Sequence, residues 1–226
     1  MQRLLKLSLI DALAETSLKA SISDITSESY SNPGVLLVQE FRKNNQIYLS
    51  LSPNGRLEAF FMVGWSEIVL HGQSIDCVFL GLSAATSMRK GSGLALTLYR
   101  RFFHDAIQAA NVSNRPVAWW FNTASPIVAG VMWRLAKDIG PKPDGTLSAR
   151  HQELLTSIQD RYNFSPFKDG QVPCVLRGFA QARYSPVEVA RLSARRTKES
   201  SILDHWHINE AARDRVIFVG QCFPSR

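Results

Sequence analysis

Residues 86–103 read TSMRKGSGLALTLYRRFF, a glycine-rich loop followed at once by an apolar-periodic run. Apolar side chains recur at every fourth position from Leu94 to Ala106, which predicts a helix from about Ser92 to Ala110 with one apolar face. Glycine adopts positive φ angles readily, and the first N–H groups of a helix have no intrahelical partner. We therefore interpret the loop as a backbone nest for an anion. The alternative is a loop that only has to turn.

Basic residues are concentrated around this loop. The chain carries a formal net charge of +7. Between Cys77 and Lys137 it has seven Lys and Arg residues and a single acid, Asp105, so this segment alone carries +6. A polyanionic ligand would explain the excess, as would nucleic acid or solubility alone.

The composition is that of an ordinary globular protein, with 45% hydrophobic and 20% charged residues in a chain of 226. This length corresponds to one domain with elaborations or to two small ones. The three cysteines lie far apart without a C-x-x-C spacing. We therefore expect neither a disulfide framework nor a zinc site, and a reducing cytoplasm as the location.

The N-terminal residues MQRLLKLSLIDALAE faintly resemble a signal peptide, but Asp11 interrupts their short apolar stretch. No segment reaches the ~20 apolar residues that a membrane span needs. We therefore expect a cytoplasmic protein with no membrane partner.

The first part of the chain predicts a strand and then a helix. Residues 4–9 partly alternate, as in a strand, and residues 10–22 have helical periodicity. Residues 30–34 (YSNPG) predict a break. Residues 35–45 fit either a short helix or a strand.

Three antiparallel strands are predicted next. Two β-like runs within residues 47–65 surround Pro53-Asn54-Gly55, a strong turn signal. A second hairpin surrounds residues 71–76, and its last strand is expected to end near Ala85.

A buried strand and a second helix are predicted after the loop and its helix. Residues 116–121 (PVAWWF) form a short, apolar run, and a strand that follows a helix is expected to lie parallel to the strand before that helix. Asn122 is expected to end this strand. Pro126 suits the first turn of a helix that continues to Lys137.

The remainder of the chain predicts additions to this core. Residues 140–170, with a polar helix over residues 148–162, indicate an insertion. Ser185 and Glu188 fit a capping box at the start of a further helix. Residues 215–223 predict a closing strand.

The glycine loop differs from two other phosphate-binding motifs. A P-loop requires Lys and then Ser or Thr after its last glycine, whereas Leu94 and Ala95 follow Gly93. A dinucleotide fingerprint requires a third glycine where Leu96 stands, and an opening βαβ unit rather than a pair of hairpins.

The order of three strands, glycine loop, helix, strand and helix resembles the GNAT family of N-acetyltransferases. The signature of that family is a bulged fourth strand, then Gln/Arg-x-x-Gly-x-Gly/Ala, then a helix. Residues 79–102, FLGLSAATSMRKGSGLALTLYRRF, match it through Gly91 and Gly93, with Met88 where Gln or Arg is usual. Residues 119–136, WWFNTASPIVAGVMWRLA, resemble the family's next strand, asparagine and helix.

This resemblance, over about residues 47–136, implies binding of acetyl-CoA or another acyl-CoA. It implies that the strand before the loop pairs through its main chain with the pantetheine arm, and that the loop holds the diphosphate by its backbone with Arg89 and Lys90 assisting. Asn122 matches the family's asparagine. The residues implied in cofactor binding are Leu82, Ser83, Ala84, Met88, Arg89, Lys90, Gly91, Ser92, Gly93 and Asn122.

Acyl transfer also uses an acid and a base. Members of the family often carry a tyrosine as general acid in the helix after the asparagine, where this chain has a tryptophan. Tyr99 in the preceding helix is the candidate acid, with a place in the core as the alternative. For the base, a carboxylate acting through water is expected, and Glu67 is preferred over Glu58, Asp76 and His71. The alternative for each is a solvated surface side chain.

Other chemistry-bearing residues favour structural roles. His205 and His207 lie on one face if their segment is extended, but two ligands without a third do not make a metal site. The cysteines have no obvious histidine partner, which favours small buried hydrophobes over nucleophiles. Trp119 and Trp120 point to opposite faces of their strand, one toward the core and the other toward the acceptor cleft.

Together these features predict a mixed α/β fold of GNAT type, in which antiparallel strands lead into a parallel pair, with a helical insertion and a C-terminal elaboration. Residues 1–140 would form the acyl-CoA-binding core, and residues 141–226 would complete the same domain. The predicted function is N-acyltransfer from acyl-CoA, with acetyl-CoA as the expected donor, to an unidentified small-molecule or peptide amine. The alternatives are a catalytically inactive GNAT-like module that binds CoA or a partner, and a basic nucleic-acid-binding domain, for which no recognition motif is visible.

Overall fold

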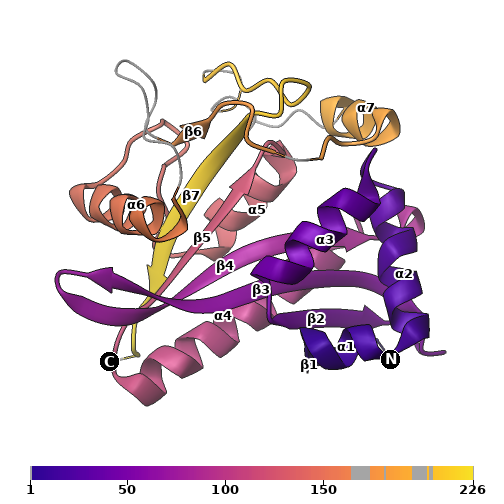
Figure 1. Ribbon diagram of the computed structural model, residues 1–226, viewed down its shortest axis with the longest axis horizontal. Helices are drawn as coiled ribbons and strands as arrows, with labels where there is room; N and C mark the ends of the chain where they lie inside the picture. The colour runs from indigo at the N-terminus through magenta and orange to yellow at the C-terminus, as the bar shows by residue number, and fades with distance from the viewer. Residues whose placement is uncertain (1, 164–173, 181, 195–202, 204–205, 226) are drawn as a thin grey trace. The chain divides into compact units, whose positions relative to one another are not determined.

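Seven strands in the order β1-β2-β3-β4-β5-β7-β6 form the sheet of the computed structural model (Figure 1). The structure describes residues 2–163, 174–180, 182–194, 203 and 206–225. The mixed α/β class is confirmed, with antiparallel strands and one parallel pair, as the sequence predicts.

Contacts between residues divide the chain into two compact units. The first unit comprises Met1–Trp65, Phe79–Asp105 and Gln181–Ala190, and the second comprises Ser66–Val78, Ala106–Ala180 and Arg191–Arg226. The split into a core over residues 1–140 and an elaboration over residues 141–226 stays a prediction.

Antiparallel pairing builds the sheet of the first unit. Its strands are β1 (Arg3–Ser8), β2 (Gln46–Leu51) and parts of β3 (Leu57–Leu70) and β4 (Gln73–Ala85). β1 pairs with β2, and β2 pairs with β3, with a register shift at Ser50/Leu51. The predicted turn joins β2 to β3, and its Gly55 has a φ of +83°, which glycine adopts without steric cost. The predicted series of three strands ending at Ala85 is confirmed.

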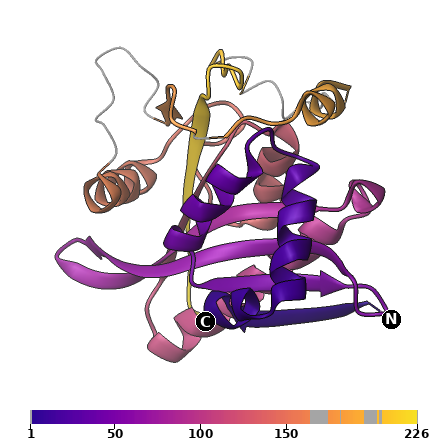
Figure 2. The same ribbon diagram turned by 45° about the vertical axis from the view of Figure 1, so that its right-hand side comes forward.

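Helices cover both faces of this part of the sheet (Figure 2). On one face lie α1 (Leu9–Ala14), α2 (Thr16–Ser27) and α3 (Pro33–Lys43), whose apolar side chains share a core with Ile47, Phe60 and Leu82 of the sheet. On the other face lies the first part of α4 (Leu94–Ser113), where Phe102 makes T-shaped ring contacts with Tyr48 and Phe61. Ile47 and Tyr48 therefore point to opposite faces, as the two-residue period of a strand requires.

The structure settles two points about the helices of this layer. The predicted helix over residues 10–22 is two helices, because Glu15 between them is extended, with φ −84° and ψ 106°. Residues 35–45, which fitted either a helix or a strand, belong largely to α3, and Pro33 occupies its first turn.

The second unit contains β5 (Val117–Thr123), β6 (Val175–Leu176), β7 (Arg215–Cys222), α5 (Pro126–Leu135) and α6 (Ala149–Tyr162). β5 and β7 pair antiparallel along their whole lengths. The prediction that Asn122 ends its strand is wrong, because Asn122 pairs with Ile217 and β5 continues to Thr123. Trp119 and Trp120 are both buried, and Trp120 packs on the ring of Tyr162 rather than facing an open cleft.

A C-terminal segment also packs within the first unit. Ser185 Oγ accepts a hydrogen bond from the Glu188 N–H at 3.3 Å, which confirms one half of the predicted capping box at the start of α7 (Pro186–Ala194). Just before it, Ser185 N donates to Ser29 O at 2.8 Å, and the rings of Tyr184 and Tyr30 lie 5.2 Å apart. None of the helices in the described ranges is long and apolar enough to cross a membrane.

Candidate active site

The glycine loop leads from β4 into α4 in the first unit. Ser87–Arg89 form a short 3₁₀ turn, and α4 begins at Leu94, two residues later than the sequence predicts. Gly91 and Gly93 both have a φ of +88°. A Cβ on Gly93 would meet no atom within 4 Å, so the backbone conformation rather than crowding requires glycine there.

The main-chain N–H groups of the loop fall into two sets. Those of Arg89, Lys90 and Ser92 donate to carbonyl oxygens inside the loop at 2.8–3.1 Å. Within the described part of the chain, the N–H groups of Gly91 and Gly93 have no hydrogen-bond acceptor. The first turn of α4 adds further N–H groups without intrahelical partners, at the positive end of the helix dipole. The amides left for an anion are therefore those of the two glycines and of this first turn.

Both predicted rim cations form ion pairs. Arg89 Nη2 lies 3.0 Å from Glu58 Oε2, and the arginine side chain is 43% exposed. Lys90 Nζ lies 2.9 Å from Glu188 Oε2, and the lysine side chain is only 11% exposed. Arg89 can therefore turn toward a ligand, whereas Lys90 holds the start of α7 against the loop.

The first residues of the loop are anchored separately. Glu28 accepts hydrogen bonds from the Ser87 N–H and from the Ser87 hydroxyl, the latter at 2.6 Å. Met88 follows with its side chain 94% exposed. The end of α2 therefore fixes where the loop begins and leaves Met88 in solvent.

Tyr99 meets β4 from the α4 face. Its hydroxyl lies 2.6 Å from Ser83 Oγ, and its ring packs edge-on against Phe61, with centroids 4.7 Å apart. The side chain is buried, and desolvation raises the pKa of Tyr99 to about 12. The hydroxyl therefore stays protonated at neutral pH and is able to donate a hydrogen bond beside β4.

Glu40 of α3 meets β4 from the opposite face. This glutamate is only 7% exposed, and its Oε2 accepts hydrogen bonds from Leu82 N at 2.9 Å and from Asn44 Nδ2 at 3.0 Å. Desolvation raises the pKa of Glu40, against a smaller lowering by Lys43 and by these hydrogen bonds. A carboxylate is thus held against the main chain of the strand that leads into the loop.

Gly81 makes this approach possible. A Cβ there would lie 2.5 Å from Asn44 Oδ1 and 2.7 Å from Glu40 Oε2, so any other residue would displace these two side chains from their present positions. Gly81 and Leu82 are adjacent, yet both face the layer of α1, α2 and α3. This departure from strict alternation is what a β-bulge produces.

Most of the predicted site residues come together in the first unit. They are Leu82, Ser83, Ala84, Tyr99 and the loop residues Met88, Arg89, Lys90, Gly91, Ser92 and Gly93. Glu67 and Asn122 belong to the second unit. There Glu67 is exposed and its Oε2 accepts a hydrogen bond from Ser74 Oγ at 3.0 Å, while Asn122 is half-buried within β5.

Glu40 and Asn44 are not among the site residues predicted from the sequence. Their signal is spacing: Leu37, Glu40 and Asn44 lie three and four residues apart, so a helix brings the two polar side chains onto the face that buries Leu37. That signal exists only if residues 35–45 are taken as helical, which the sequence left open.

The cysteines and the possible metal ligands do not form a further site among the described residues. The three cysteines are buried, as expected of small hydrophobes, and desolvation raises the pKa of each thiol to about 12. Among the described residues, no three His, Cys, Asp or Glu side chains gather as a metal site. His205 lies outside the described residues.

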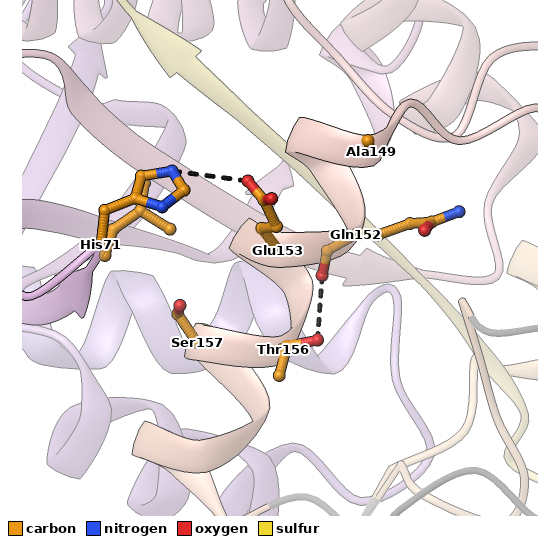
Figure 3. Close-up of a pocket in the computed structure, with 7 residues that line it drawn as sticks. His71, Ala149, Gln152, Glu153, Thr156 and Ser157 are labelled. Carbon is orange, nitrogen blue, oxygen red and sulfur yellow. Dashed lines mark hydrogen bonds and ion pairs between the residues drawn. The ribbon is translucent and has the colours of Figure 1, made fainter.

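A shallow groove in the second unit is lined by residues of α6, by His71 of the β3–β4 turn and by Leu70 at the end of β3 (Figure 3). In it His71 Nε2 lies 3.4 Å from Glu153 Oε2, with both side chains more than half exposed. This groove offers no buried polar group, so His71 is a solvated surface side chain here.

Comparisons with known proteins concern the fold. No family model matches the chain, and no curated protein matches it. Solved structures do match, among them the ribosomal-protein-S18-alanine N-acetyltransferase from Escherichia coli, at 10% identity and a TM-score of 0.44 over 100% of this chain and 97% of that one. At this identity the similarity concerns the fold alone.

Two further structures match in part. A GNAT family acetyltransferase from Brucella melitensis, in complex with acetyl-CoA, matches at 16% identity and a TM-score of 0.38, over 54% of this chain and 75% of that one. A probable N-acyltransferase from Enterococcus faecalis matches at 14% identity and a TM-score of 0.44 over 59% of this chain, and the match spans 32% of its length. What these GNAT-like proteins bind or acylate is a property of those proteins.

Proposed function

We propose that this protein transfers an acyl group from acyl-CoA to a primary amine, with acetyl-CoA as the expected donor. The observation that carries the proposal is the glycine loop: two residues at φ +88° leave N–H groups without acceptors at the start of α4. Such amides, at the positive end of a helix dipole, favour a phosphate group. A buried tyrosine and a buried glutamate face the strand that feeds this loop.

Acyl-CoA, the acyl donor, would be bound mainly by main-chain groups. Gly91, Gly93 and the first turn of α4 would donate hydrogen bonds to the diphosphate, and the half-exposed Arg89 would leave Glu58 to assist. The main chain of Ser83 and Ala84 would pair with the pantetheine arm, as the GNAT resemblance implies, whereas the Leu82 N–H already donates to Glu40. Acyl-CoA supplies a thioester, an acyl group already activated for attack by an amine.

Tyr99 would act on the leaving sulfur. Its hydroxyl is held at β4 by Ser83 and remains protonated, so it is able to donate a hydrogen bond, and then a proton, to a thiolate. Glu67 and Asn122 stay candidates from the sequence, as base and as cofactor contact.

Titration calorimetry with CoA and acetyl-CoA, followed by an assay of thiol release with a panel of primary amines, tests the proposal. We expect both ligands to bind and at least one amine to release thiol. Absence of binding by both ligands would contradict the function. Binding without turnover on any amine would instead favour the inactive CoA-binding module.

The contribution of Arg89 is expected to be modest. Arg89→Ala should weaken CoA binding by on the order of 1 kcal/mol at low salt, because an exposed charge contact is screened by solvent. The loss should shrink as salt rises. Calorimetry at two salt concentrations checks this, with Arg56→Ala on the exposed β2–β3 turn as the control that should bind CoA like the parent. A loss that salt leaves unchanged would mean that Arg89 acts through structure rather than charge.

Removing the Tyr99 hydroxyl is expected to affect turnover more than binding. Tyr99→Phe keeps the ring against Phe61, so CoA affinity should stay within about threefold, while turnover should fall by roughly 10- to 100-fold through loss of the proton donor. Tyr48→Phe is the matched control, since its hydroxyl bonds Asp105 on the same face at 3.0 Å. Equal turnover for Tyr99→Phe and the parent would leave Tyr99 a core residue.

A further inference from the structure

Glu40 is a carboxylate buried against the strand along which the acyl donor is proposed to lie. Taking a carboxylate out of water is costly unless donors or a cation compensate for the lost solvent. At Glu40 the compensation consists of two hydrogen bonds, from Leu82 N and Asn44 Nδ2, and of Lys43 on the same helix. Gly81 is the residue whose missing side chain permits this arrangement.

Asn44 supplies a second acceptor beside this carboxylate. Its Nδ2 donates to Glu40 O at 2.8 Å and to Glu40 Oε2 at 3.0 Å, so the orientation of the amide is determined by two acceptors. Its Oδ1 is buried and has no hydrogen-bond partner among the described residues. The side chain of Asn44 is itself 6% exposed, so water does not satisfy this oxygen from bulk solvent.

The Glu40 carboxylate and the unpartnered Asn44 amide oxygen lie side by side at Gly81. Two such acceptors would be satisfied by a ligand with several N–H donors. A primary ammonium group has three such donors and a positive charge. An anion or a carbonyl group has no donor and would leave the same oxygens unsatisfied, and a hydroxyl has only one donor and no charge. The chemistry of the pair therefore matches the acceptor half of an N-acyltransfer reaction.

We propose that Glu40 and Asn44 bind the acceptor's primary amine beside Leu82, and that Glu40 takes its proton during acyl transfer. The inference rests on the proposed acyl-CoA function. The bound ammonium first loses one proton to solvent through Glu40. The amine nitrogen then forms a bond to the thioester carbonyl carbon while the carbon–sulfur bond breaks; a second proton passes from nitrogen to Glu40, and one passes from Tyr99 to sulfur. Solvent returns the Tyr99 proton and removes the one on Glu40, so the products are an amide and the free thiol.

The two groups reach β4 from opposite faces. Glu40 reaches β4 from the layer of α1, α2 and α3, and Tyr99 reaches it from the α4 face. The proton acceptor and the proton donor are therefore separated by the strand. Because burial raises the pKa of Glu40, its carboxylate is a better proton acceptor than an exposed glutamate.

Glu40→Gln tests the proposal with little change of shape. The glutamine oxygen is able to accept the same two hydrogen bonds, so CoA affinity should match that of the parent. Turnover with every amine that the parent acylates should fall by roughly 100-fold or more, and the rise of kcat/KM with pH should disappear. Glu15→Gln, at the exposed junction of α1 and α2, is the control that should keep the parent's rate and pH profile.

The pH dependence of Tm tests the raised pKa of Glu40 without any amine substrate. A raised pKa in the folded state means that the parent loses stability as pH rises from the ordinary value of a glutamate through the raised one. Glu40→Gln carries no such cost, so its Tm relative to the parent should increase over that window. A Glu40 whose pKa is not raised would instead leave the difference in Tm between Glu40→Gln and the parent unchanged over that window.

The outcomes separate the two proposals. A parent that fails to bind CoA, or that binds it without acylating any amine, contradicts the proposed function and the role of Glu40 with it. A parent that binds and acylates, beside a Glu40→Gln variant with the same rate and pH profile, overturns the role of Glu40 alone. Loss of turnover at unchanged CoA affinity, together with the gain in relative Tm, supports it.

Discussion

Replacing Gly91 by valine is expected to abolish most of the affinity for CoA. Gly91 has a φ of +88°, a conformation that a β-branched residue adopts only at a cost of about 1–3 kcal/mol, and the valine side chain would stand where a phosphate must approach the main chain. We expect Kd to rise by roughly 100-fold, about 2.8 kcal/mol. Titration calorimetry measures it, and raising the salt should not restore binding, because the block is steric.

Gly55→Val separates this effect from backbone strain. Gly55 also has a positive φ, +83°, with no atom within 4 Å of its would-be Cβ, but it lies in the β2–β3 turn. The control should lower Tm and leave CoA binding as in the parent. If Gly91→Val binds CoA as tightly as the parent does, the loop is not the phosphate site.

Gly64→Ala is expected to cause a large loss of stability. A Cβ at Gly64 would lie 2.1 Å from the main-chain oxygen of Lys43, at the end of α3. A carbonyl fixed in the backbone does not rotate away, so α3 would have to move off β3. We expect the free energy of unfolding to fall by about 3 kcal/mol, measured by urea denaturation.

Gly34→Ala, in the helix α3 whose end packs on Gly64, is the control. No atom lies within 4 Å of a Cβ at Gly34, so the free energy of unfolding should stay the same or rise by up to about 1 kcal/mol, since alanine favours a helix. Equal stability of Gly64→Ala and the parent would mean that the end of α3 does not pack on β3 as the structure has it, and Glu40 would lose its support against β4.

Local signals in the sequence were enough for most of the fold. The turn residues at Pro53-Asn54-Gly55 and the four-residue spacing from Leu94 to Ala106 depend on neighbours along the chain, and both predictions are confirmed. The break between α1 and α2 was missed because no glycine or proline marks Glu15. β6, a strand of two residues, has no periodicity to detect.

Of the candidate site, the glycine loop could be predicted from the sequence, and the position of Glu40 could not. The glycine loop is a contiguous motif, so its residues and their positive φ angles follow from the sequence. Glu40 reaches β4 across more than forty positions of sequence, through the space left by Gly81, and no local pattern encodes that contact. The ion pair of Lys90 with Glu188 spans 98 positions of sequence, so no local pattern predicts that the side chain of Lys90 is only 11% exposed.

Amide chemical shifts during a titration with CoA measure anion binding by the loop most directly. A ¹⁵N-labelled sample, titrated near physiological salt, should show the resonances of Gly91, Gly93 and Leu94 shifting together and saturating at one Kd, with the Glu40→Gln variant giving the same response. Shifts confined to residues of the second unit, or no shift at saturating CoA, would contradict a diphosphate site at this loop.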